Sequence, residues 1–131
     1  MKNVTRLTHK NLHQIASGDT LKEAICIIKF YSSKCSFCHN LKDAYTALAD
    51  SFEDDPDIYF FVYNVDGVPS KAMPKQIEIN GVPTICRIET GLKNPKIKIL
   101  DEPAEPDKLT WYHPKDMLRF VGSSAQKREQ K

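Results

Sequence analysis

Apolar residues follow two different spacings along the chain, and the change from one to the other predicts its central elements. Residues 24–31 and 58–65 are nearly continuous apolar runs of strand length, which is typical of strands covered on both faces. Between them, apolar side chains recur every three or four residues as far as Glu53, so a helix with one apolar face is expected. This order of elements predicts a βαβ unit with parallel strands and a right-handed crossover.

The segment before this unit predicts a leading strand and a short helix over residues 9–16. Thr8 is a candidate N-cap, because its hydroxyl can accept a hydrogen bond from the first helical turn. Leu7 and Leu12 stand at the two positions of a hydrophobic staple.

The second half of the chain predicts shorter elements. A short helical segment is expected between Ser70 and Ile77, with Pro74 near its start. The apolar runs 84–88 and 96–100 flank a turn rich in Gly, Asn and Pro, which predicts a β-hairpin.

The C-terminal segment predicts a last helix over residues 114–121, since Pro114 fits the first turn of a helix. Residues 122–131 are polar, and we expect them to form a flexible tail. A chain of 131 residues can bury a core without disulfides, so residues 1–121 are expected to form one domain.

The charges nearly cancel, with 19 Lys and Arg residues against 17 Asp and Glu residues, and the basic residues are scattered. This pattern argues against a nucleic-acid partner. No apolar run approaches the roughly 20 residues that span a bilayer, and the first residues lack the apolar core of a signal peptide. We therefore expect a soluble, cytoplasmic protein without a membrane partner.

Two of the four cysteines have a spacing that indicates chemistry. Cys26 and Cys86 lie inside apolar runs, where a free cysteine behaves as a small apolar side chain. Cys35 and Cys38 form a Cys-x-x-Cys motif at the start of the central helix, where backbone amides and the helix dipole favour a thiolate. The motif therefore predicts a redox centre. A tetrahedral zinc site would need a second ligand pair, which the sequence lacks, so no metal or other cofactor is expected.

Further motifs around this pair resemble those of the thioredoxin family. In order and approximate spacing they extend over about residues 4–121. They are Arg6-Leu7-Thr8, Phe30-Tyr31, Cys35 with Cys38, Asn64-Val65-Asp66 and Gly81-Val82-Pro83-Thr84. The resemblance implies the α/β thioredoxin fold, in which a mixed central β-sheet is flanked by helices on both faces.

The resemblance also implies a cis peptide bond between Val82 and Pro83, facing the cysteine pair. Proline has no N–H, and this turn would leave the Val82 backbone free to pair with a bound polypeptide. Gly81, Val82 and Pro83 are therefore expected to contact the substrate. Alternatively, Pro83 starts an ordinary strand, since proline is tolerated at the first strand position.

The two cysteines would then have separate roles. Cys35 would attack a target disulfide as the exposed nucleophile, and Cys38 would resolve the mixed disulfide. Ser36 and Phe37 would tune Cys35 and contact the substrate. Lys34 either favours the Cys35 thiolate through its charge or is an ordinary solvated lysine.

One departure from the family lies six residues before Cys35, where thioredoxins carry a buried acid and this chain has Lys29. The lysine that accompanies that acid is also absent, because its position is Val62. A Lys29 amine beneath Cys38 would accept a proton and make the disulfide more oxidising. Alternatively, the amine snorkels to the surface with only its stem buried.

The predicted function is that of a thioredoxin-like thiol–disulfide oxidoreductase, which reduces protein disulfides and receives electrons from a thioredoxin reductase or another dithiol donor. Two alternatives are a redox-silent module that binds proteins through the groove around Pro83, and a glutaredoxin-like enzyme that depends on glutathione. The leading strand and helix favour the thioredoxin type over the glutaredoxin type. We expect a monomer.

Overall fold

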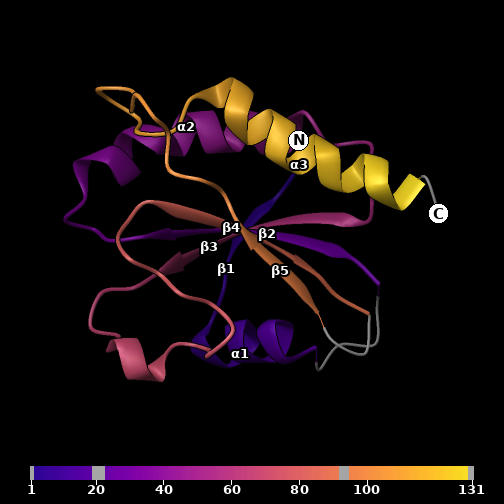
Figure 1. Cartoon of the computed structure of the whole chain (residues 1–131), viewed down its shortest axis with the longest axis horizontal. Coiled ribbons are helices and arrows are strands. Elements are labelled where there is room, and N and C mark those ends of the chain that lie inside the picture. Colours follow the sequence, from indigo (N-terminus) through magenta and orange to yellow (C-terminus); the bar gives the residue numbers. More distant parts are fainter. Residues whose placement is uncertain (1, 19–22, 92–94, 130–131) are drawn as a thin grey trace.

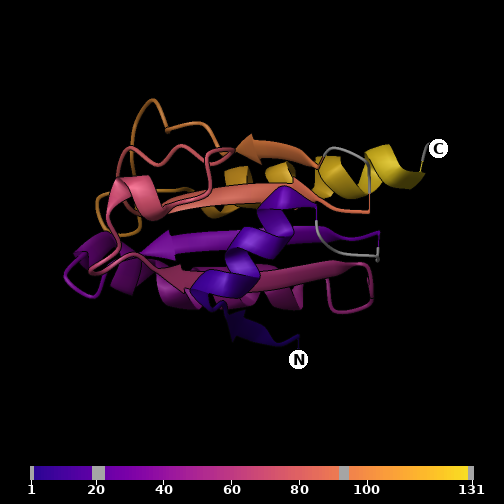
Figure 2. The ribbon, with the colours of Figure 1, turned by 90° about the horizontal axis from the view of Figure 1, so that it is seen from below.

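A five-stranded mixed sheet forms the centre of the computed structural model, which describes residues 2–18, 23–91 and 95–129, the last seven of them (123–129) by their backbone alone (Figure 1). The strand order is β1-β3-β2-β4-β5, with β1 and β5 at the two edges (Figure 2). β1 and β2 run parallel to β3, whereas β4 is antiparallel to both β2 and β5. The strands are β1 (Val4–Arg6), β2 (Ile25–Tyr31), β3 (Ile58–Asn64), β4 (Thr84–Glu89) and β5 (Lys96–Ile99).

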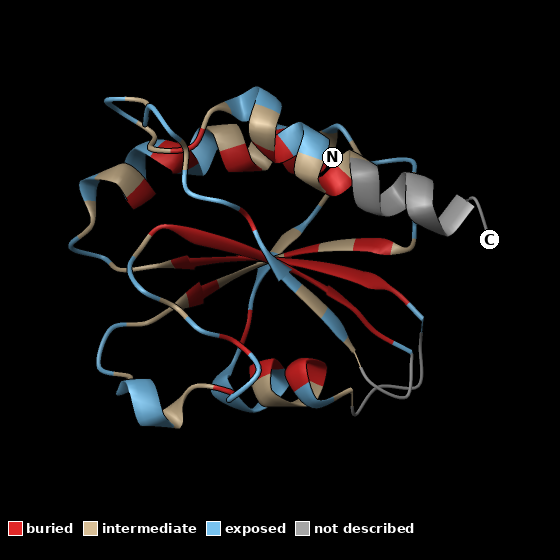
Figure 3. Cartoon of the chain, viewed as in Figure 1, coloured by how far each residue is buried: buried red, intermediate tan, exposed pale blue. Residues whose placement is uncertain are grey.

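Helices cover both faces of this sheet. α2 (Ser36–Asp50) and α3 (Pro114–Glu129) lie on one face, and α1 (His9–Ser17) lies on the other (Figure 1). Each face has its own apolar cluster, because successive strand residues point to opposite faces. Burial is concentrated in the central strands, above all β2 and β4, and in the helix faces turned toward the sheet, whereas the edge strands β1 and β5 contain no buried residue (Figure 3). The predicted fold, a mixed sheet with helices on both faces, is confirmed.

The two long apolar runs form the central strands of the sheet. β2 and β3 pair in parallel, and α2 connects them, so the predicted βαβ unit is confirmed. Every residue of β2 except Tyr31 is buried. Cys26 and Cys86 are free thiols in the core, where burial raises the pKa of Cys26 to about 12. Both thiols therefore stay protonated and unreactive at neutral pH.

The first helix begins and ends as local chemistry dictates. The Thr8 hydroxyl accepts a hydrogen bond from the Asn11 amide at 3.1 Å, which confirms Thr8 as the N-cap. Leu7 and Leu12 are buried in the same cluster. The helix ends at Gly18, whose φ of 78° is a left-handed conformation that suits glycine.

The predicted hairpin is confirmed, since β4 and β5 pair in antiparallel fashion, but the helical segment beyond β3 differs from its prediction. It is a single 3-10 turn, η1 (Ser70–Ala72), and Pro74 follows this turn instead of starting it. Met73, which precedes the proline, is extended with φ −74° and ψ 151°. The Pro74 ring disfavours helical geometry at Met73, so the turn must end there.

The last helix begins at Pro114 as predicted but continues to Glu129, past the expected end near Val121. The added residues include Ala125, Gln126, Lys127 and Arg128, which are good helix formers, and no proline interrupts them. The flexibility of residues 122–131 stays a prediction. Within the described ranges, no helix combines the length and the apolar character needed to cross a membrane.

Candidate active site

Cys35 and Cys38 lie where β2 leads into α2, and a disulfide joins them. Cys35 is the N-cap of α2, and its sulfur accepts a hydrogen bond from the Cys38 amide at 3.1 Å. Cys38 is only 3% exposed, whereas Cys35 is half-buried, and the neighbouring Lys34 and Ser36 are exposed. Of the two sulfurs, that of Cys35 is therefore the one open to a large partner. The N-terminus of α2 also stabilises negative charge on it.

The loop before β4 faces this pair. The peptide bond between Val82 and Pro83 is cis, and the Val82 carbonyl oxygen lies 3.7 Å from the Cys35 sulfur. β4 begins only at Thr84, so Pro83 is not the start of an ordinary strand. The Tyr112 hydroxyl donates a hydrogen bond to the Pro83 carbonyl at 3.2 Å. These contacts hold the half-buried Val82 backbone directly beside Cys35.

Asp66 fixes the loop that leads into the cysteine pair. Its carboxylate accepts hydrogen bonds from the Ser33 amide at 3.0 Å and from the hydroxyls of Ser32 and Ser33. These donors lower the pKa of Asp66 to about 2. The carboxylate is therefore ionised at all physiological pH values and ties the end of β3 to the end of β2.

Phe37 is held in place by the loop that precedes α3. Its ring packs edge-to-face against Trp111 with 5.3 Å between ring centroids. The Trp111 indole donates a hydrogen bond to Glu102 at 2.6 Å, and the Asn40 side chain donates one to the Leu109 carbonyl at 3.0 Å. The loop over residues 100–113, between β5 and α3, thus forms one wall beside the Cys-x-x-Cys motif.

Lys29 lies inside the protein, and the alternative in which its amine snorkels to the surface is wrong. The residue is 4% exposed, and its amine lies over the Tyr45 and Tyr31 rings at 5.1 and 5.9 Å from their centroids. Lys29 and Cys38 line the same pocket of about 340 Å³. Burial and the nearby charge of Lys42 lower the pKa of Lys29 to about 8.

This pKa predicts that Lys29→Met stabilises the protein by about 1–2 kcal/mol at pH 7, after allowance for solvent reaching the pocket. The pKa is 10.5 in the unfolded chain and about 8 in the folded protein. Below pH 8 both states carry the charge, so folding bears the full cost of burying it. Between pH 8 and 10.5 the folded protein alone loses the proton, and this cost disappears. Urea unfolding of both proteins should therefore show a gain at pH 7 that shrinks by pH 10.5. An equal gain in the free energy of unfolding at both pH values would contradict a lowered pKa for Lys29.

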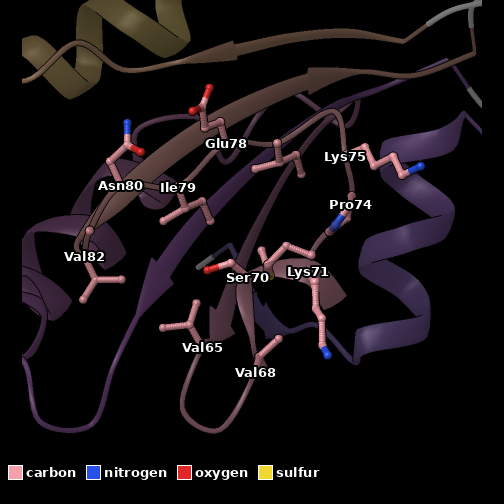
Figure 4. Close-up of a pocket in the computed structure, with 13 residues that line it drawn as sticks. Val65, Val68, Ser70, Lys71, Pro74, Lys75, Glu78, Ile79, Asn80 and Val82 are labelled. Atoms are coloured by element: carbon pink, nitrogen blue, oxygen red, sulfur yellow. The ribbon is translucent and has the colours of Figure 1, made fainter.

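A groove of about 850 Å³ lies on the other side of the Val82 loop. Figure 4 shows Ile79 and Val82 across from Val65 and Val68, and the groove is open beside Val82. These four side chains make this part of the groove apolar. Gly81 lines the groove, is exposed, and has space where a side chain would project.

Three contributors to this region were not predicted from the sequence: the Asp66 hydrogen bonds, the Trp111 packing and the position of Lys42 in the Lys29 pocket. Asp66 follows directly after β3, whose end lies beside the end of its parallel partner β2. Lys42 stands one helical turn beyond Cys38. Both placements follow from the predicted elements, whereas the Trp111 contact joins segments far apart in the chain. Among the described residues, no group of three or more His, Cys, Asp or Glu side chains is placed to hold a metal ion.

Comparison with known proteins gives one family and several similar folds. The family model described as Thioredoxin matches residues 3–112. No curated protein matches the chain. The Trx4 domain of ERdj5 superposes with a TM-score of 0.70 at 11% identity, covering 97% of this chain and 99% of that chain.

Two thioredoxins are also similar in structure. Chloroplastic thioredoxin z has a TM-score of 0.63 at 18% identity, covering 96% of each chain. The thioredoxin Mala s 13 of Malassezia sympodialis has a TM-score of 0.64 at 14% identity, covering 94% of this chain and 91% of that chain. At these identities the likeness concerns the fold.

Proposed function

The chain belongs to the thioredoxin family, and from this premise we propose that it is a thiol–disulfide oxidoreductase that reduces protein disulfides through Cys35 and Cys38. The observation that carries the proposal is the position of the pair. Cys35 accepts the first amide hydrogen bond of α2 and stands open beside the Val82 carbonyl, while Cys38 is buried behind it. Attack and resolution are thus divided between an accessible sulfur and a protected one.

The proposed reaction has two steps. The Cys35 thiolate attacks one sulfur of a target disulfide, so a Cys35–target bond forms, the target disulfide breaks, and a target thiolate leaves. Cys38 then loses its proton and attacks Cys35, which forms the Cys35–Cys38 disulfide and releases the second target thiolate. Two electrons pass to the target, whose thiolates take up two protons.

Lys29 is the proposed acceptor of the Cys38 proton. The two residues line the same pocket, and the lowered pKa of Lys29 leaves part of the amine neutral near pH 7 to 8. Once protonated, the ammonium favours a Cys38 thiolate and hence the reduced state. A lysine here thus takes over the proton transfer that an acid performs elsewhere in the family.

The substrate polypeptide is proposed to bind along the Val82 loop. Its backbone would pair with Val82, whose own chain turns at the cis bond to Pro83, and its side chains would enter the apolar groove next to Gly81. Phe37, held against Trp111, would contact the substrate on the opposite side of Cys35. The exposed Lys34 and Ser36 complete the surface around the sulfur.

A glutathione-dependent, glutaredoxin-like enzyme and a redox-silent binding module are the competing functions. We expect the protein to accelerate insulin reduction by dithiothreitol and to turn over hydroxyethyl disulfide with glutathione far more slowly. Both assays use the same enzyme preparation. The blank of each assay contains the reductant without the enzyme. Faster turnover with glutathione would favour the glutaredoxin type, and no turnover in either assay would favour a binding module.

Lys29→Ala is expected to make the Cys35–Cys38 couple less oxidising. Removal of the ammonium withdraws a charge that stabilises the reduced pair, so the reduction potential should fall by about 30 mV or more, which is tenfold in the exchange constant. Equilibration of each variant with glutathione buffers, followed by trapping of free thiols, measures the change. A matched variant is Lys10→Ala, an exposed lysine on α1, on the other face of the sheet. Equal potentials for the wild type and Lys29→Ala would mean that Lys29 does not act on the pair.

A thioredoxin reductase or another dithiol donor is the proposed source of electrons, because each cycle leaves the pair oxidised. The cytoplasmic location and the monomeric state stay predictions.

A further inference from the structure

The pocket behind the cysteine pair has an unusual charge. Eight residues line it, among them Lys29, His39 and Lys42, and none of the eight is Asp or Glu. The pocket has a volume of about 340 Å³ and reaches Cys38 at the start of α2. It therefore combines a positive lining with room for a small ligand.

Lys29 has no acidic partner among the residues that the structure describes. The residue is only 4% exposed, and its amine lies over the ring faces of Tyr45 and Tyr31. Ring faces attract a cation, but they do not neutralise it. A buried charge is ordinarily paired, so a charged Lys29 calls for an anion.

Asp66, an acidic residue close to the pocket, is already engaged in hydrogen bonds. Its carboxylate accepts three hydrogen bonds from Ser32 and Ser33, and both of these serines line the pocket. Asp66 itself is not among the lining residues. Asp66 therefore does not pair with Lys29, which lines the pocket together with Lys42.

We propose that this pocket is a binding site for a small oxyanion of the phosphate or sulfate class, held between Lys29 and Lys42. The disulfide form should bind it more tightly, because in the reduced form a Cys38 thiolate competes for the Lys29 ammonium. By linkage, the bound anion stabilises the disulfide and makes the pair a stronger reductant. The inference rests on the proposed function only for this redox consequence.

In the first test the oxidised protein is titrated with inorganic phosphate and with sulfate. Binding is measured by calorimetry or by the shifts of the amide NMR signals. Potassium chloride at equal ionic strength serves as the control for charge screening. We expect saturable binding that Lys29→Met weakens by about tenfold or more and Lys42→Met by about threefold, in proportion to how deeply each charge is buried. Lys10 belongs to α1, which lies on the opposite face of the sheet, so Lys10→Met should leave binding unchanged.

The second test is the reduction potential at saturating phosphate. If the disulfide form binds phosphate tenfold more tightly, the potential falls by about 30 mV. Two results would overturn the site. One is an equal signal in potassium chloride, which would indicate an adventitious ion only, and the other is phosphate binding that Lys29→Met does not weaken. If Lys29→Met folds poorly, Lys42→Met still tests the site, because Lys42 is exposed and its replacement does not disturb the core.

The two proposals fail separately. A protein that reduces insulin in chloride buffer but binds neither phosphate nor sulfate would overturn the anion site alone. A protein that binds phosphate through Lys29 but does not reduce insulin would overturn the proposed function and its redox consequence, and the site itself would stand.

Discussion

Cys35→Ser is expected to lower catalysed insulin reduction by roughly 1,000-fold or more, to the rate of dithiothreitol alone. A serine hydroxyl at the N-cap of α2 is not ionised at neutral pH and cannot form the mixed disulfide. The replacement should leave the fold intact, because serine is itself a favoured N-cap and can accept the Cys38 amide hydrogen bond. Initial rates with insulin at one enzyme concentration measure the effect.

The matched control removes a cysteine that has no proposed role. Cys26→Ala deletes a buried thiol in β2 and should retain the wild-type rate while costing some stability. Circular dichroism of both variants separates loss of chemistry from loss of fold. Activity of Cys35→Ser close to that of the wild type would remove Cys35 from the reaction.

Cys38→Ser is expected to stop turnover after the first step and to accumulate a covalent enzyme–substrate complex. Cys35 still attacks, but no inner thiol displaces it, so the mixed disulfide persists until an external thiol cleaves it. Because Cys38 is 3% exposed, the serine that replaces it stays buried behind the mixed disulfide. Non-reducing gels after mixing with a disulfide-bearing protein should show a new band that dithiothreitol removes.

The double variant Cys35→Ser with Cys38→Ser provides the control for this trap and should give no band. A band that persists in the double variant would arise from Cys26 or Cys86. Absence of any band with Cys38→Ser, while the wild type is active, would reverse the roles of the two cysteines.

Much of the fold could be predicted because it depends on patterns local to each segment. The apolar run of β2 reflects burial on both faces of the sheet, the spacing of α2 reflects one apolar helix face, and the N-cap Thr8 bonds to the first turn of its own helix. The end of α3 could not be placed in this way. Residues beyond Val121 are polar and show no apolar period, yet their helical propensity allows the helix to continue to Glu129.

In the site, too, some residues could be placed from local motifs and others only from packing between distant segments. The cysteine pair and the turn at Pro83 could be placed from motifs, whereas the position of the Lys29 amine could not, since either burial or snorkelling is compatible with one lysine in a strand. Packing decides it, because the side chain is 4% exposed and its amine lies over the rings of Tyr45 and Tyr31. The Trp111 contact on Phe37 likewise depends on a loop whose path no local pattern specifies.

A single-turnover reaction tests the central claim most directly. The reduced protein is mixed with insulin in the absence of other thiols, free thiols are blocked at intervals, and the disulfides of both proteins are mapped by mass spectrometry. We predict that a Cys35–Cys38 disulfide forms at the rate at which insulin disulfides disappear, with Cys26 and Cys86 still reduced. Insulin disulfides that remain intact, or oxidation that falls on Cys26 or Cys86 instead, would contradict the account.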